Sequence, residues 1–209
     1  MTVAVLAVQG AFIEHEMMLN QIGVECFEIR KKTDLECSFD GLILPGGEST
    51  VQGKLLKELD LFDPLKQKIE QGLPVLGTCA GLILLAKQLS NYKHSYFGTL
   101  PVVVKRNAYG RQLGSFCVEA EMKGIGTIPM SFIRAPYIER IDSGVEVLAK
   151  VNENIVAVQW KNQIGISFHP EVTNCTKIHE YFCELMDKKP RILIKNHNFY
   201  IEKKVKRIE

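Results

Sequence analysis

The hydrophobic pattern of the chain changes near residue 98. In the first half, short uninterrupted apolar runs alternate with longer stretches in which apolar residues recur among polar ones. Uninterrupted apolar runs are typical of strands in a parallel sheet whose two faces are both covered by helices. The predicted strands are 3–8, 24–29, 41–44 and 74–76, and the predicted helices are 12–22, 55–71 and 82–89.

Beyond residue 98 the strand candidates follow one another without intervening helices, which indicates antiparallel additions to the sheet. A last helix is predicted at about 175–186, and no Gly/Ser linker or internal repeat divides the chain. We therefore expect one α/β domain over residues 1–187: a three-layer, flavodoxin-like, mostly parallel sheet with helices on both faces and antiparallel strand additions. The strand candidates of this half are 100–104, 115–121, 145–151, 155–160 and 163–168.

The composition of the 209 residues, 46% hydrophobic and 24% charged, is that of a globular chain rather than a disordered one. The apolar runs are shorter than the ~20 residues of a membrane-spanning helix, and no basic segment precedes the apolar start of the chain. The six cysteines form no CxxC pair, which favours free thiols in a reducing compartment. We expect a cytoplasmic protein without membrane contact.

The net charge of +2 is unevenly distributed, because residues 188–209 hold eight Lys/Arg and two Glu. The remaining body is mildly acidic, which is not typical of a nucleic-acid-binding domain. A basic tail suits RNA, an acidic partner or a membrane surface, but we favour a solvated, poorly ordered end without such a role.

The segment Gly77–Gly81 places Cys79 between two glycines, after a predicted strand and before a helix. This matches a nucleophile elbow, a sharp turn whose closely packed backbone leaves no room for flanking side chains. The helix N-terminus favours a thiolate, and the N–H of Ala80 would point to a developing oxyanion. A buried structural cysteine is the competing interpretation, and this segment alone does not decide between the two.

His169 and Glu171 follow an apolar strand and are separated by Pro170, which disfavours a helix there. In an extended chain residues i and i+2 project to the same side, so Glu171 can hold one nitrogen of the imidazole ring while the other faces a thiol. Alone, the pair is more simply a satisfied contact at a strand end. Together with an elbow cysteine, it predicts a Cys79–His169–Glu171 triad.

Two glycines, Gly46 and Gly47, follow Pro45 at the end of another predicted strand. Glycine lets a peptide turn its N–H toward a substrate, so this loop is a candidate source of a second oxyanion donor. No Gly-Lys-Ser/Thr sequence follows, which excludes a Walker loop. A plain turn is the simpler interpretation of this segment taken alone.

Together these three segments resemble class I (triad) glutamine amidotransferases. Segments 6–15, 106–112 and 132–136 narrow the resemblance to the glutaminase subunit of pyridoxal 5′-phosphate synthase, over about residues 3–186. The resemblance implies that Cys79 attacks the side-chain amide of glutamine, that ammonia leaves, and that water hydrolyses the resulting thioester. His169 would act as base and then acid, oriented by Glu171.

The same resemblance implies the remaining site residues. The oxyanion donors would be the N–H groups of Gly47 and Ala80, and the synthase partner would be met at Gln9, Glu14 and His15, for which a solvated helix start is the alternative. One of two arginines would hold the glutamine carboxylate. No cofactor is expected here, because pyridoxal 5′-phosphate would form on the partner. The implied glutamine contacts are Gly46, Gly47, Glu48, Ser49, Arg106, Ile133 and Arg134.

A metal site is a weaker alternative. Cys175, His179 and Cys183 share one face of the last predicted helix, but the two cysteines lie ~12 Å apart along it, too far to bind one zinc ion. We interpret all three as core-facing and expect no metal.

Two other functions compete with a glutaminase. A cysteine hydrolase or protease of similar fold would cleave peptides and ignore free glutamine. A non-catalytic scaffold would hold the synthase together without chemistry, and the intact triad argues against it.

Overall fold

The computed structural model describes residues 1–108 and 115–187. Its strands are β1 (Thr2–Leu6), β2 (Glu25–Ile29), β3 (Gly41–Leu44), β4 (Val75–Thr78), β5 (Ala86–Leu89), β6 (Leu100–Lys105), β7 (Ser115–Met122), β8 (Gly126–Ile133), β9 (Tyr137–Ile141), β10 (Glu146–Val151), β11 (Asn154–Trp160) and β12 (Gln163–Ile166). Its helices are α1 (Phe12–Gln21), α2 (Ser49–Glu58), α3 (Phe62–Glu70), α4 (Ala80–Leu85) and α5 (Lys177–Asp187), with the short 3-10 helices η1 (Lys32–Glu36) and η2 (Pro170–Val172).

The strands form one mixed sheet and a separate ribbon. In the sheet, β2, β1, β3, β4 and β12 lie side by side and run parallel. The sheet continues through antiparallel pairs to β11, β9 and β6, and β5 pairs with β6 in parallel at the far edge. β10 pairs with β11, and β7 pairs with β8 in the ribbon. The predicted parallel sheet with antiparallel additions is confirmed.

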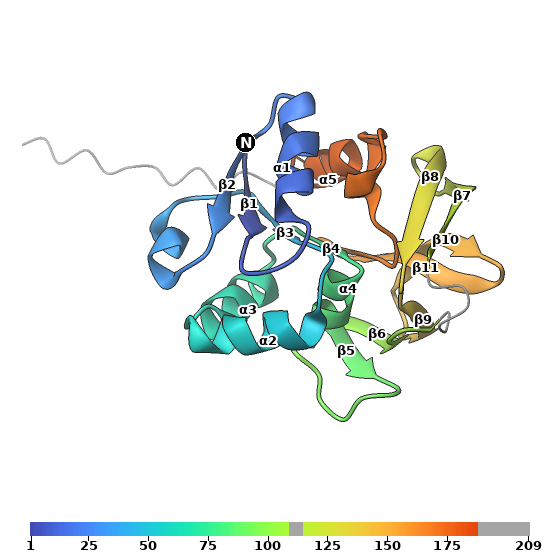
Figure 1. The fold of residues 1–209 in the computed structure, drawn as a ribbon, viewed down its shortest axis with the longest axis horizontal. Coiled ribbons are helices and arrows are strands. Elements are labelled where there is room, and N and C mark those ends of the chain that lie inside the picture. The colour runs from blue at the N-terminus through green and yellow to red at the C-terminus, as the bar shows by residue number, and fades with distance from the viewer. Residues whose placement is uncertain (109–114, 188–209) are drawn as a thin grey trace, which may run out of the picture.

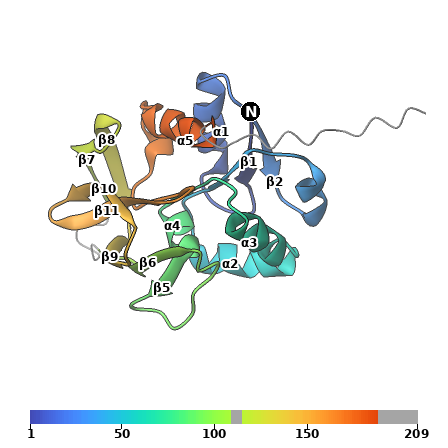
Figure 2. The same cartoon turned by 180° about the vertical axis from the view of Figure 1, so that it is seen from behind.

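Helices cover both faces of the parallel strands, with α1 and α5 on one face and α2, α3 and α4 on the other (Figure 1 and Figure 2). Alternate residues of β1 explain why its apolar run is uninterrupted. Val3 and Val5 pack in the cluster that includes Leu19 of α1, whereas Ala4 belongs to the cluster that includes Leu65 of α3. Both faces of the strand are therefore buried, which gives the three-layer architecture that the pattern predicts.

Two predicted helices are wrong in their extent. The single helix expected over 55–71 is two helices, because Asp60 adopts a left-handed conformation with φ of 54° and Pro64 cannot occupy the interior of a continuous helix. The helix expected over 82–89 ends at Leu85, and residues 86–89 become an edge strand that pairs with β6.

Two strands were missed in the second half, β8 and β9. In β8 the side chains of Ile128, Met130 and Phe132 are buried while their neighbours are not, which is the alternation of a strand with one covered face. This pattern was visible in the sequence, but Pro129 interrupts it and argues against a central strand. The structure resolves the conflict by placing β8 in a two-stranded ribbon.

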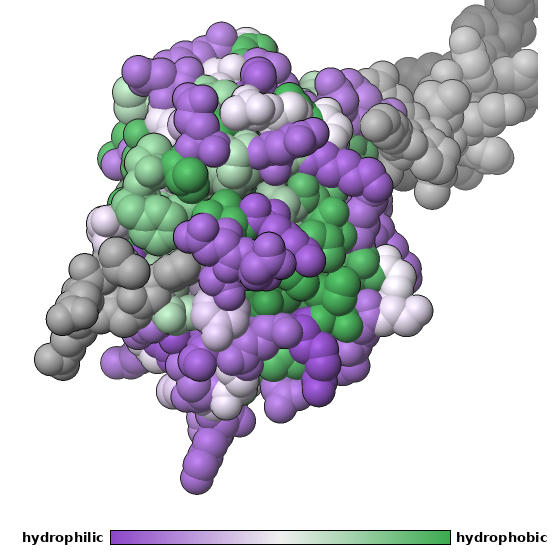
Figure 3. Space-filling view, turned by 90° about the vertical axis from the view of Figure 1, so that its right-hand side faces the viewer, coloured by the Kyte–Doolittle hydropathy of each residue, from purple (hydrophilic) through white to green (hydrophobic). Residues whose placement is uncertain are grey.

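The surface of the side that carries β7 and β8 shows several hydrophobic patches among hydrophilic residues (Figure 3). Across residues 1–108 and 115–187, none of the helices is both long and apolar enough to span a membrane. The basic tail predicted at 188–209 lies outside the described residues.

The carboxyl ends of β1, β3, β4 and β12 meet at one edge of the sheet because these strands run parallel. The segments that follow them begin at residues 7, 45, 79 and 167, and they include all three segments that the sequence singled out. This edge is where ligands bind in sheets of this kind.

Candidate active site

Cys79 lies at the turn between β4 and α4, in a conformation that side chains rarely adopt, with φ of 47° and ψ of −96°. Its N–H donates to the carbonyl oxygen of Ile166 at 2.8 Å, which ties the turn to β12. The flanking glycines are needed for packing: a Cβ on Gly81 would collide with the carbonyl oxygen of Leu44, and one on Gly77 would lie 2.8 Å from the carbonyl carbon of Gly81. The turn has the geometry of a nucleophile elbow.

His169 and Glu171 follow β12, where the backbone N–H of His169 donates to the carbonyl oxygen of Ser131 at 2.8 Å. The extended chain expected through this segment is wrong beyond His169, because Pro170 begins the short 3-10 helix η2, where proline fits since the first turn needs no N–H from it. Nδ1 of His169 and Oε1 of Glu171 are 2.7 Å apart, and both residues are buried. The arrangement is that of a base and the carboxylate that orients it.

The protonation of His169 follows from its neighbours. Burial alone would lower its pKa, but the hydrogen bonds and charges of Cys79 and Glu171 outweigh burial and raise the pKa of His169 to about 10. Burial also opposes the charge of Glu171, yet His15 and His169 lower the pKa of its carboxyl group. A protonated His169 therefore lies between a carboxylate and the sulfur of Cys79, with a proton available for a leaving group.

The loop after β3 packs against both the triad and the start of α1. Gly46 lies directly against the imidazole of His169, with Nδ1 2.6 Å from the position that a Cβ would occupy. Its carbonyl oxygen accepts a hydrogen bond from the N–H of Ala11 at 3.0 Å. The N–H of Glu48 donates to Oε1 of Gln9 at 2.8 Å. The orientation of the Gly46–Gly47 peptide thus depends on residues that precede α1.

These segments surround one cavity of about 270 Å³. Cys79 and His169 line it, and so do all of the glutamine contacts that the sequence analysis names. Ala80 and Glu171 lie behind this lining and are buried. The lining residues are Gln9, Gly10, Ala11, Gly46, Gly47, Glu48, Ser49, Cys79, Ile83, Arg106, Asn107, Ile133, Arg134, His169 and Val172.

Comparison with known proteins identifies the family. The model of the SNO glutamine amidotransferase family matches residues 5–188. The chain belongs to this family. It is similar to the pyridoxal 5′-phosphate synthase subunit PdxT of Desulfitobacterium hafniense strain Y51, with 62% identity over 88% of this chain and 92% of that protein. The corresponding subunit of Haemophilus influenzae strain PittGG is 54% identical over 88% of this chain and 98% of that protein.

A solved structure of a glutamine amidotransferase has the same fold. It matches 88% of this amidotransferase and 98% of its own chain, with a TM-score of 0.84 and 44% sequence identity. The likeness extends over the parallel strands and the added ones, so the fold predicted from the hydrophobic pattern is that of class I glutamine amidotransferases.

Two arginines of the amidotransferase line the cavity: Arg106 follows β6 of the sheet, and Arg134 follows β8 of the ribbon. Arg134 has a left-handed backbone, with φ of 44°, and its guanidinium lies 3.4 Å from Oε1 of Glu48. Arg106 exchanges backbone hydrogen bonds with the side chain of Asn91, and its guanidinium stacks over the ring of Tyr92 at 4.8 Å. Both arginines line the cavity, so either can reach an anionic group inside it.

The three residues predicted to contact a partner differ in their exposure to solvent. Gln9 is partly buried at the cavity and Glu14 is exposed on α1. His15 is 0% exposed, which corrects the prediction for this residue: a side chain with no exposed surface cannot contact a partner. The alternative of a solvated helix start is also wrong for His15. His15 is buried because α1 packs against α5, which is far away in the sequence.

Gln52 and Thr78 are buried polar residues near the site to which the sequence analysis gave no role. Nε2 of Gln52 donates to the carbonyl oxygens of Gln9 and Pro45, at 2.9 and 3.1 Å, and so joins the two loops below the cavity. Nothing in the local pattern marks Gln52, since a polar residue in an amphipathic helix is ordinarily exposed.

Only His179 and Cys183 of the three metal candidates lie in α5, because this helix begins at Lys177, after Cys175. His179 is buried, as expected of a core-facing residue, while Cys175 and Cys183 are partly buried against the same hydrophobic cluster. Within the described ranges, no group of three or more His, Cys, Asp or Glu side chains is arranged to hold a metal ion.

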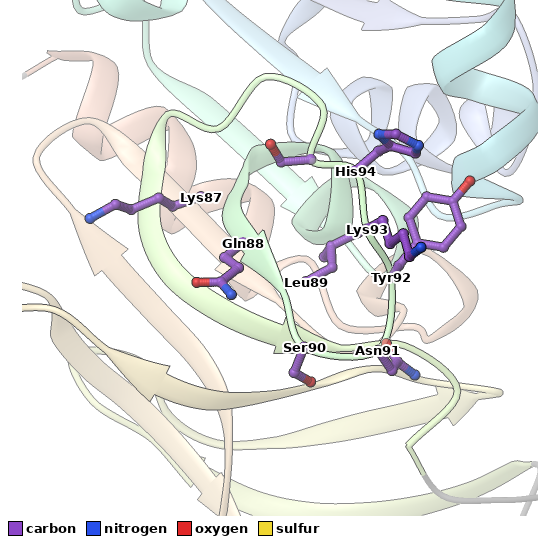
Figure 4. A pocket seen from close by; sticks show the side chains of 9 residues that line it. Lys87, Gln88, Leu89, Ser90, Asn91, Tyr92, Lys93 and His94 are labelled. Atoms are coloured by element: carbon purple, nitrogen blue, oxygen red, sulfur yellow. The ribbon is translucent and has the colours of Figure 1, made fainter.

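A second, larger hollow of about 700 Å³ lies along residues 87–95, which are the end of β5 and the loop after it (Figure 4). Its wall is one continuous segment of chain, with Lys87, Tyr92 and His94 among its exposed side chains. Lys87 is already paired with Asp142, with Nζ 2.7 Å from the carboxylate. No residue of the triad lines this hollow. The chemistry of the amidotransferase therefore belongs to the smaller cavity.

Proposed function

We propose that this amidotransferase hydrolyses L-glutamine to glutamate and ammonia, and that a pyridoxal 5′-phosphate-forming synthase subunit takes up the ammonia. The observation that carries the reaction is the 2.7 Å contact between His169 and Glu171 beside an elbow cysteine, in a cavity of about 270 Å³. The relatives from Desulfitobacterium hafniense and Haemophilus influenzae are named as subunits of pyridoxal 5′-phosphate synthase, which supports the choice of partner.

In the proposed reaction the sulfur of Cys79 attacks the side-chain carbonyl carbon of glutamine. The C–N bond then breaks, and His169 gives its proton to the departing nitrogen, so that ammonia leaves and a γ-glutamyl thioester remains. Water attacks the thioester, with His169 now accepting a proton from it. The C–S bond breaks with its electron pair going to sulfur, which releases glutamate and restores the thiolate of Cys79 beside a protonated His169. Glu171 keeps the imidazole ring oriented through both steps.

The oxyanion of each tetrahedral intermediate would be held by two backbone N–H groups, those of Ala80 and Gly47. Ala80 is the first residue of α4, where helix N–H groups have no partner within the helix. Gly47 follows a peptide whose carbonyl is bonded to Ala11, which turns its N–H away from α1. The α-carboxylate of glutamine would be bound by Arg106 or Arg134, with the loop residues Gly46, Glu48 and Ser49 and the rim residue Ile133 completing the contacts.

The partner would dock on the exposed side of α1. Glu14 is exposed there, next to Ile13 and Met17, whose side chains are 55% and 57% exposed. Exposed apolar residues one helical turn apart are suited to a protein interface. Docking at this helix would reach the oxyanion loop through Gln9 and Ala11, which bond to that loop. We infer that the isolated chain is a poor glutaminase that the partner activates.

The proposal includes no cofactor or metal on this chain. Pyridoxal 5′-phosphate would be the product of the partner, and every step above uses only side chains and backbone of the amidotransferase. The described cysteines are free thiols, which supports a reducing, cytoplasmic setting.

Ammonia release from glutamine, measured for the full chain alone and with the synthase subunit, tests the function. One oxyanion donor is worth about 10²–10³ in turnover, and we expect the partner to raise the rate by that factor. Cys79→Ala should reduce the activated rate by about 10⁴-fold or more. Cys117→Ala, at an exposed cysteine of β7, is the matched control and should keep the rate.

Three results would contradict parts of this proposal. Equal rates of ammonia release with and without the partner would contradict the proposal that docking activates the enzyme. Peptide cleavage without glutamine hydrolysis would indicate a protease. No ammonia under either condition, with an intact complex, would indicate a scaffold.

A further inference from the structure

The polar contacts of the triad do not end at Glu171. Oε2 of Glu171 faces Nε2 of His15 at 3.5 Å, and the same nitrogen lies 3.2 Å from the hydroxyl oxygen of Thr78. On the other side of the ring, Nδ1 of His15 lies 2.9 Å from Nε2 of His179. His15, Thr78 and His179 are each 0% exposed. Four elements thus meet in a dry polar cluster behind the triad: α1, β4, η2 and α5.

The available hydrogen-bond partners determine which ring nitrogen carries the proton in His15 and in His179. Burial lowers the pKa of both His15 and His179, so both rings are neutral. If Nε2 of His15 carries the proton, it donates toward Thr78 and the carboxylate. Nδ1 of His15 then accepts from Nε2–H of His179, and Nδ1 of His179 is left without a proton.

The opposite assignment fails on two counts. It would turn a lone pair of His15 toward the carboxylate of Glu171. It would also leave a buried N–H at Nδ1 of His179, which has no hydrogen-bond partner among the described residues. Unpaired buried donors are rarer than unpaired acceptors. The cluster therefore has one direction: His179 donates to Nδ1 of His15, and the N–H at Nε2 of His15 points to the hydroxyl of Thr78, with Oε2 of Glu171 facing the same N–H at the longer distance of 3.5 Å.

We propose that His15 and His179 are positioning residues, which hold the outer oxygen of Glu171 so that its inner oxygen keeps the imidazole of His169 aimed at Cys79. Oε2 of Glu171 is buried and makes no hydrogen bond to the described residues, and Nε2 of His15 faces it at 3.5 Å. Neither histidine lines the cavity, so neither touches the substrate. The proposal rests on the triad assigned above and adds to it the helices α1 and α5.

Holding the carboxylate of Glu171 in place requires a hydrogen-bond donor, such as His15, and not merely a buried side chain. A carboxylate held through one oxygen can still rotate about its side-chain bonds, and His169 would rotate with it. A donor at the second oxygen removes that freedom. Displacement of reacting groups by about 1 Å can cost on the order of a hundredfold in rate, which sets the largest effect expected from losing the donor.

The test compares variants with and without the donor, in the full chain. His15→Phe removes it, whereas His15→Gln keeps an N–H at the same distance from the backbone as Nε2. His179→Phe removes the donor to His15, and His179→Gln keeps it. Ile69→Ala, a buried residue of α3 on the opposite face of the sheet, is the control for lost stability alone.

Two measurements report on positioning. With the synthase subunit present, His15→Phe should lower kcat for glutamine by up to about a hundredfold and leave KM within a few-fold, and His15→Gln should recover most of kcat. In the chain alone, the rate at which iodoacetamide alkylates Cys79 is followed against pH by mass spectrometry. The change in alkylation rate that accompanies loss of the proton from His169 should occur at lower pH in the Phe variants and nearer to the wild-type pH in the Gln variants.

The alkylation profile requires no glutamine hydrolysis, so it remains informative if the proposed function fails. A purely structural role would lower the melting temperature of the His15 and His179 variants, as in Ile69→Ala, with kcat and the alkylation profile unchanged. That result would overturn the proposal. Equal losses of kcat in His15→Phe and His15→Gln would also overturn it. If His15→Phe does not fold, the same comparison is made between His179→Phe and His179→Gln.

Discussion

The groups that line the cavity differ according to which part of the sheet they come from. Cys79, His169 and Gly46 follow parallel strands, are buried, and are held by backbone contacts to neighbouring strands and loops. Arg134 and Ile133 come from the added ribbon and are exposed, with the side chain of Arg134 73% exposed. Reacting groups need a fixed geometry, whereas groups that bind a substrate need access to solvent. The parallel half therefore supplies the reacting groups and, in the loop 46–49, part of the binding surface, and the additions supply the arginines of that surface.

The strongest test of this comparison is a substitution in the parallel half that replaces none of the reacting residues but shifts one of their side chains. In Gly46→Ala the new methyl group would collide with the imidazole of His169 and displace it. We expect kcat to fall by about a hundredfold while the chain remains folded. Ammonia release and the melting temperature measure the two effects. Wild-type turnover in this variant would show that the position of His169 is less constrained than its packing suggests.

Changes in the additions should act on binding instead. Loss of a charge-assisted hydrogen bond typically costs about 1.5–3 kcal/mol, so replacing the arginine that holds the carboxylate should raise KM by roughly ten- to hundredfold with a smaller effect on kcat. Arg106→Ala and Arg134→Ala are compared on glutamine and on its α-carboxamide. The variant that no longer prefers glutamine over the α-carboxamide identifies the arginine that binds the carboxylate. A fall in kcat alone in both variants would contradict the division between the two parts.

The smallest effect on turnover is expected from removing residues 190–209, which follow both the parallel strands and the added ones in the sequence. The family match ends at residue 188, so truncation after Lys189 should leave turnover within a few-fold and the melting temperature unchanged. Steady-state kinetics with the partner and a thermal melt measure this. Loss of folding or of complex formation would give residues 190–209 a role that the family match does not indicate.

Local patterns were sufficient to predict the reacting groups. The Gly-x-Cys-x-Gly spacing around Cys79 and the His-Pro-Glu spacing are visible within a few residues of each other along the chain, although the contact that requires Gly81 is with Leu44 of β3. For the same reason the parallel strands were found: each is an apolar run of strand length between turn residues. The broken helix at 55–71 was also within reach, because Pro64 marks the break.

Contacts between distant segments could not be predicted in this way. His15 is separated from His179 by 164 residues, and its burial depends on α5 packing over α1. Gln52 looks like an exposed polar residue of a helix until the loops at Gln9 and Pro45 close around it. Residues 86–89 form a strand because β6 offers an edge to pair with, although their composition is compatible with helix. In each case tertiary packing outweighs local preference.

The left-handed backbone of Cys79 has a consequence for how this protein can change. A residue other than glycine held at such an angle typically costs on the order of 1–3 kcal/mol of folding stability. Glycine at this position would relieve that strain and remove the sulfur. Stability and activity thus favour different residues at position 79. Random substitution under selection for thermostability alone would tend to lose the nucleophile, whereas selection for glutamine hydrolysis retains it despite its energetic penalty.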